Sequence, residues 1–75
     1  MKYLLLRRGK EDGEPATAEH FDSEFEATNW ARSWLQSHAE HDRYVLKPED
    51  DSRNLLMIRT VAGQWYAMPL ADPVR

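Results

Sequence analysis

Residues 4–6 read Leu-Leu-Leu, residues 55–58 read Leu-Leu-Met-Ile and residues 65–68 read Trp-Tyr-Ala-Met. Each is a continuous apolar run, whereas a strand that is buried on one face alternates apolar and polar residues with a period of two. The runs therefore predict strands that are covered on both faces. One amphipathic helix covers about one face of a small sheet, so the pattern predicts a second cover, and the simplest candidate is a second copy of the chain.

The helix that covers the first face is clearly marked. Ser23 and Glu26 form a capping box, in which the serine hydroxyl and the glutamate carboxylate each serve a free backbone amide. The residues that follow at spacings of three and four define one apolar stripe, made of Ala27, Trp30, Ala31, Trp34, Leu35 and His38. The pattern predicts a helix over about residues 24–39 that packs against the sheet, with Trp34 in the core.

The strands are expected around this helix, at residues 2–8, 16–21, 43–47, 55–61 and 64–70. The fold class is then α+β, with two layers: one helix on an antiparallel sheet of four to five strands, in the order β-β-α-β-β-β. Residues 16–21 are the least strand-like, and whether they form a strand is left open. Pro69 cannot donate to a sheet ladder, so the last strand is expected to be an edge or to end there.

The turn between the last two strands contains Gly63. A type I turn through Val61 and Ala62, with Gly63 in the left-handed conformation, suits these residues better than a tight two-residue turn. The polar loop at residues 9–15 and the segment at residues 71–75 are less suited than a second copy to cover an apolar sheet face.

Length and composition limit what the chain can be. Its 75 residues fit a single domain over residues 1–70 with a frayed tail at 71–75. It has no cysteine, which excludes disulfides and thiolate chemistry, and its net charge of −3 argues against a general nucleic-acid binder. No run is long enough for a membrane span, and we expect a cytoplasmic protein.

The candidate chemistry is weak. His38 and His41, with Asp42, could supply part of a metal site, but histidines are also favoured at the negative end of a helix, and His20 lies near the opposite end. The acidic residues 49–51 lack the spacing of a calcium loop and fit a solvated turn. The sequence predicts no catalytic residue, no metal site and no cofactor.

The function that remains is a small non-enzymatic protein-interaction or regulatory module. We expect it to self-associate as a homodimer, or to bind another protein, through an apolar sheet face. Which face forms the interface is left open, and the interface candidates are Leu4, Leu6, Met57, Trp65 and Tyr66. The alternative is a single-stranded nucleic-acid-binding module, in which Arg59 and an aromatic residue such as Trp65 or Tyr66 would stack on bases.

Overall fold

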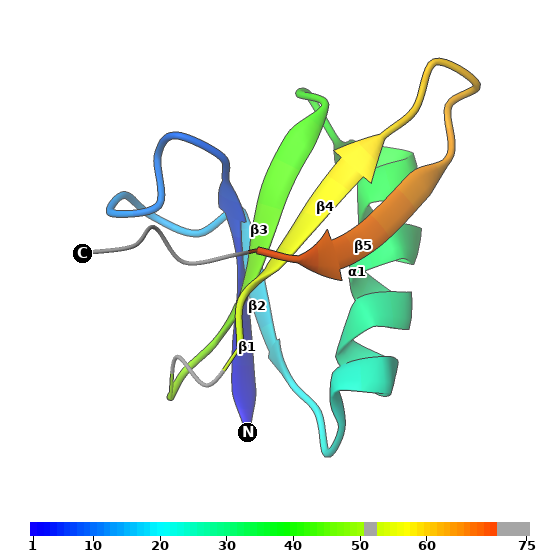
Figure 1. Cartoon of the computed structure of the whole chain (residues 1–75). Coiled ribbons are helices and arrows are strands. Elements are labelled where there is room, and N and C mark those ends of the chain that lie inside the picture. Colours follow the sequence, from blue (N-terminus) through cyan, green and yellow to red (C-terminus); the bar gives the residue numbers. More distant parts are fainter. Residues whose placement is uncertain (51–52, 71–75) are drawn as a thin grey trace.

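A computed structural model describes residues 1–50 and 53–70. The elements follow the chain as β1 (Lys2–Arg7), β2 (Thr17–His20), α1 (Glu24–His38), β3 (Arg43–Pro48), β4 (Leu55–Arg59) and β5 (Trp65–Pro69). The strands form one five-stranded antiparallel sheet, and α1 lies against one face of it (Figure 1). The α+β class and the predicted order of elements are confirmed. The predicted tail at residues 71–75 lies outside the described residues.

The strand order in the sheet is β2-β1-β3-β4-β5. The leucine-rich β1 therefore has a neighbouring strand on each side. The uncertain segment does form a strand, but only over Thr17–His20 and at one edge. The other edge is β5, where Pro69 is placed as expected for a residue with no N–H to give.

The helix begins after Ser23, whose hydroxyl accepts a hydrogen bond from the Glu26 N–H at 3.2 Å. Its buried residues are Ala27, Ala31 and Leu35. Trp34 is only partly buried and packs against the core cluster, so the expectation that its indole lies in the core is confirmed only in part. The alanines have little side chain, which lets the helix backbone approach the sheet, and the indole lies along the flank of the buried stripe.

The core fills the space between α1 and the sheet. The sheet contributes alternate residues of β1, β3, β4 and β5, namely Tyr3, Leu5, Tyr44, Leu46, Leu55, Met57 and Trp65. We call this side of the sheet the inner face and the opposite side the outer face. Partly buried Phe21, Trp30, Trp34 and Ala39 pack around the core. In the described residues, no helix is both long and apolar enough to cross a membrane.

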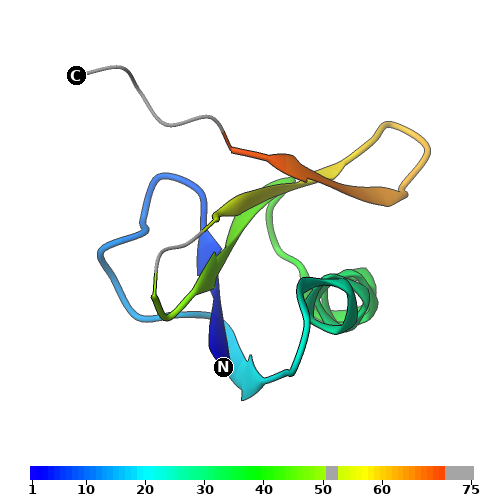
Figure 2. The ribbon, with the colours of Figure 1, turned by 60° about the horizontal axis from the view of Figure 1, so that its bottom comes forward.

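The outer face is partly covered by the chain itself. Leu6 and Val45, which lie opposite each other on that face, are only 2% and 1% exposed. The loop between β1 and β2 lies on this side of the sheet in both ribbon views (Figures 1 and 2). Its ends are fixed beside Leu6, because Arg8 N–H donates to the Arg43 carbonyl and Ala16 N–H to the Leu5 carbonyl. The polarity of this loop does not keep it off the face, contrary to our expectation.

The β4–β5 turn has the geometry that its residues predict. The Gly63 N–H donates to the Thr60 carbonyl at 2.9 Å, so Val61 and Ala62 are the central residues of the turn. Gly63 has φ of 86°, a left-handed conformation that is strained for residues with a Cβ.

Candidate interaction surface

The outer face carries an apolar patch at its β4–β5 end. We call Leu56, Ile58, Tyr66 and Met68 the outer patch. Leu56 lies directly opposite Met68, and Ile58 lies opposite Tyr66, so the side chains are contiguous. Tyr66 is 51% exposed and Met68 47% exposed, while Leu56 and Ile58 are half-buried. Two large apolar side chains therefore face solvent side by side.

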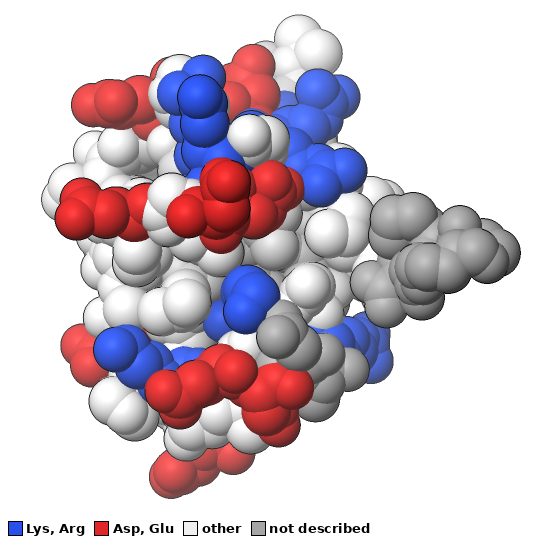
Figure 3. Space-filling view, turned by 90° about the vertical axis from the view of Figure 1, so that its left-hand side faces the viewer, with Lys and Arg blue, Asp and Glu red and all other residues white. Residues whose placement is uncertain are grey.

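Charges are distributed unevenly on this side of the molecule. Viewed from the side away from α1, most acidic and basic side chains gather toward the top and the bottom, and the band between them is mostly uncharged, with one basic group near its middle (Figure 3).

Strand β5 also presents a free backbone edge. The Thr60 N–H donates to the Gln64 carbonyl and the Leu70 N–H donates to the Asn54 carbonyl. In an antiparallel pair such bonded positions alternate with unbonded ones. The backbone groups of Trp65, Ala67 and Pro69 therefore point away from β4. Within residues 1–50 and 53–70, no strand pairs with this edge.

A groove lies beside that edge, between α1 and the start of β5. Its volume is about 560 Å³, and it is lined by Asn29, Arg32, Ser33, Gln36, Ser37, Gln64, Trp65 and Tyr66. The helix residues in this set come from the side of α1 that does not face the core. Arg32 is the only charged residue among them, which leaves the groove free of acidic side chains.

The interface candidates named from the sequence divide between the two faces. Leu4, Leu6 and Tyr66 lie on the outer face, where Leu4 is half-buried and Leu6 buried. Met57 and Trp65 are 0% and 3% exposed in the inner core, so they take no part in an outer surface. Neighbouring residues of a strand point to opposite faces, which puts the next residue of each run outside.

Sequence reasoning missed Met68 and Ile58 as surface residues. The signal that could have found Met68 was available, because it lies two positions from Tyr66 and shares its face. Leu56 and Ile58 follow from Met57 in the same way once one residue of the run is known to point inward. A continuous apolar run does not itself reveal that phase.

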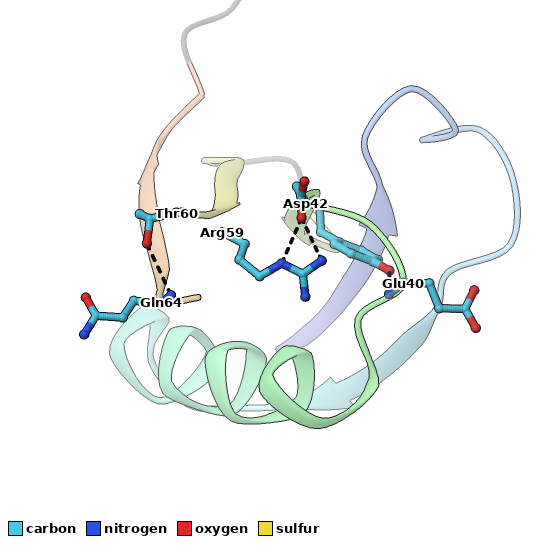
Figure 4. Close-up of polar contacts among 6 residues, drawn as sticks. Glu40, Asp42, Arg59, Thr60 and Gln64 are labelled. Atoms are coloured by element: carbon cyan, nitrogen blue, oxygen red, sulfur yellow. Dashed lines mark hydrogen bonds and ion pairs between the residues drawn. The ribbon is translucent and has the colours of Figure 1, made fainter. Parts of the chain in front are cut away.

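Arg59 and Trp65, the pair considered for base stacking, contact each other within the fold. The Arg59 guanidinium lies 5.3 Å from the centroid of the Trp65 ring and forms an ion pair of 2.7 Å with Asp42 (Figure 4). The edge of the Tyr44 ring meets the same indole at a centroid distance of 6.0 Å. Trp65 thus packs among its neighbours and offers no open ring face to a base.

The histidines are also placed by local packing. The His38 ring stacks on Trp34 at 4.7 Å, with Nδ1 3.1 Å from the Trp34 carbonyl. His41 lies near the Tyr44 ring. Among the described residues, no three or more histidine, aspartate or glutamate side chains gather where they could hold a metal ion.

The shifted acid–base groups lie away from the outer patch. Burial raises the pKa of the Tyr3 phenol, and nearby Glu24 and Asp50 raise it further. The pKa of Glu11 is lowered because its carboxylate accepts the backbone N–H groups of Gly9 and of Glu11 itself, and because Arg8 lies beside it.

A comparison with known protein families, curated proteins and solved structures finds no match to this chain. The function must therefore be argued from the surface itself.

Proposed function

We propose that this protein is a small, non-enzymatic interaction module that self-associates through β5 and the outer patch. The observation that carries the proposal is the exposure of Tyr66 and Met68, at 51% and 47%, beside a strand edge with no partner in the described residues. A contiguous exposed apolar patch and an unpaired strand edge are both features that a soluble monomer tends to avoid, whereas scattered apolar residues such as Phe25 are ordinary.

A second copy of the chain is the partner that best fits its size. A domain of about this length buries only about 60% of the surface of its unfolded chain, so it gains stability from an added interface. Most soluble homo-oligomers are two-fold symmetric, and such an interface uses one patch on both copies. The outer patch and the β5 edge adjoin each other and can serve together in this way.

The geometry supports single-stranded nucleic-acid binding less well. That alternative needs exposed aromatic rings interleaved with free basic groups. Trp65 is buried and Arg59 is paired with Asp42, which leaves Tyr66 as the exposed aromatic residue of β5. A salt titration separates the two functions, since binding to nucleic acid weakens steeply with salt and an apolar protein contact does not.

A double variant, Tyr66→Ser with Met68→Ser, tests the proposal. It removes the exposed apolar side chains without touching the inner core, and it is expected to be monomeric at about 50 μM, where a dimer of micromolar Kd is largely formed. Phe25→Ser is the matched control, because Phe25 is a 74% exposed aromatic residue on α1. Light scattering on the eluting protein gives the mass of each variant. Equal dimer content in the unmodified chain and the double variant would contradict the proposal.

A further inference from the structure

We propose that β5 pairs antiparallel with β5 of a second copy, in a register that places Ala67 on the two-fold axis. This inference rests on the self-association proposed above and specifies its geometry. It joins the sheets of the two copies into one continuous sheet.

The backbone of β5 is self-complementary in this register. The outward-pointing groups are those of Trp65, Ala67 and Pro69, as the bonds of β5 to β4 require. The Ala67 N–H donates to the carbonyl of the partner's Ala67, and the Trp65 N–H donates to the carbonyl of the partner's Pro69. Symmetry repeats both bonds. The missing N–H of Pro69 removes one donor and leaves the rest of the ladder intact.

The same register brings the exposed apolar side chains together. Tyr66 lies directly opposite the partner's Met68, and Met68 lies opposite the partner's Tyr66, both pairs on the outer face. These positions have no outward backbone bonds, and side chains at such positions approach each other most closely. This one register therefore gives the outward backbone groups of β5 hydrogen-bond partners and covers both exposed side chains.

On the inner face the register fits the groove beside α1. Pro69 shares the inner side with Trp65, since it lies opposite the core residue Leu55. The partner's Pro69 then comes to lie opposite Trp65, at the β5 wall of the groove. Ala67, at the axis, has the smallest side chain that a strand carries apart from glycine, which leaves room for the helix of each copy.

The composition of β5 removes charge as an obstacle to strand pairing and leaves Pro69, a residue type that also blunts strand edges, at one end of the strand. Its sequence, Trp-Tyr-Ala-Met-Pro, has no charged residue. Natural edge strands commonly carry charges that prevent pairing with another chain, and like charges opposite each other would destabilise a symmetric pair. No such repulsion arises about Ala67.

Single-cysteine cross-linking tests the register, because the chain has no native cysteine. Facing residues at a bonded antiparallel position lie about 5.5 Å apart between Cα atoms, within the range that a disulfide spans. Ala67→Cys is therefore expected to form a disulfide dimer under mild oxidation. The rate should exceed that of a matched control by at least about tenfold, since thiols held in a complex have an effective concentration on the order of mM.

Two controls use the same assay on the same full chain. Val61→Cys lies in the same hairpin and is more exposed, but it is far from the proposed axis. Ala18→Cys occupies the corresponding outward position on β2. Preferential cross-linking at position 67 supports the register. If sedimentation shows a dimer while position 67 cross-links no faster than 61, or more slowly than 18, the register is wrong and self-association stands. A monomer in sedimentation overturns both.

Discussion

The two edge strands of the sheet, β2 and β5, differ in charge and in hydrogen bonding, although neither has an outer neighbour among the described residues. Strand β2 has four residues and ends in exposed Glu19 and His20, and the Glu19 carboxylate accepts the outward N–H of His20 at 3.2 Å. Strand β5 is uncharged, and the Gln64 side-chain oxygen, which precedes Trp65, accepts from the Tyr66 hydroxyl at 2.7 Å. The first edge is short and charged, with one outward N–H bonded by a side chain, whereas the second carries no charge.

The helix reinforces the same difference. On one side of α1, Trp30 packs on Phe21, which follows β2, at a centroid distance of 5.1 Å. On the other side, toward β5, α1 presents amides, hydroxyls and Arg32 around the groove. Aromatic packing thus covers the β2 side of α1, whereas polar side chains line the groove on the β5 side.

Truncating a core residue in the central strand of the sheet has the largest expected effect on stability. Leu46 of β3 is fully buried and lies opposite Leu5 of β1 and Leu55 of β4. Leu46→Ala should lower the free energy of unfolding by about 2–5 kcal/mol in chemical denaturation. Amide exchange should accelerate at both edges together. The fully exposed Val61→Ala is the control, with a change within about 0.5 kcal/mol. Selective loss of protection in β2 alone would show that the edges depend on separate cores.

Truncating Trp34, which lies beside the buried stripe of the helix, should have a smaller effect on the free energy of unfolding. A fully buried tryptophan loses about 3–5 kcal/mol on truncation, and Trp34 is only partly buried, so Trp34→Ala should lose roughly half of that. The dimer affinity at fixed folded fraction should not change, because the indole lies away from the β5 groove. Denaturation and sedimentation on the same variant separate the two quantities. A loss equal to that of Leu46→Ala would mean that the indole is a core group.

Much of this architecture is predictable from the sequence, but the phase of the strands is not. The Ser23–Glu26 cap, the glycine at 63 and the apolar runs predict the elements and their order. A continuous run gives no alternation to say which residue points inward, so the interface candidates named from the sequence include Met57 and Trp65 of the core and omit Ile58 and Met68 of the outer patch. The apolar stripe of the helix is also wider than the part of it that is buried, which is Ala27, Ala31 and Leu35. For this reason the spacing alone places Trp34 in the core.

The position of the first loop was hidden for a different reason. Its residues are polar, which suggests solvent, yet its ends are held by backbone bonds to Leu5 and Arg43 that do not depend on side-chain polarity. Tertiary hydrogen bonds of this kind leave no pattern in the sequence.

A proline placed at each edge compares the edges directly. Ala67→Pro removes an outward N–H of β5, and Ala18→Pro removes an outward N–H of β2, so neither breaks a bond within the sheet. Each lost bond is worth about 0.5–1.5 kcal/mol and symmetry doubles it at position 67, so Ala67→Pro should weaken the dimer by roughly 5- to 150-fold. Ala18→Pro should leave the dissociation constant unchanged. Equal weakening by both variants would remove the distinction between the edges.

The smallest expected effect concerns the loop that leads to β2. The pKa of Glu11 is lowered in the folded state, so its stabilising contribution is present above the unfolded pKa of about 4.3 and is lost as the pH falls through the folded pKa. Glu11→Gln should therefore reduce the melting temperature slightly at neutral pH and flatten its decline in acid. Thermal melts from pH 7 to pH 3 measure both. A variant that melts as steeply in acid as the unmodified chain would contradict this role.

The central claim is that β5 is an interface between copies of this chain. Sedimentation velocity of the unmodified protein at about 50 μM tests it most directly, since a dimer of micromolar Kd is largely formed at that concentration. The account predicts a species of about twice the chain mass of 8.8 kDa, with little binding of a hydrophobic dye. A species of the single-chain mass would contradict it, whatever the dye binding.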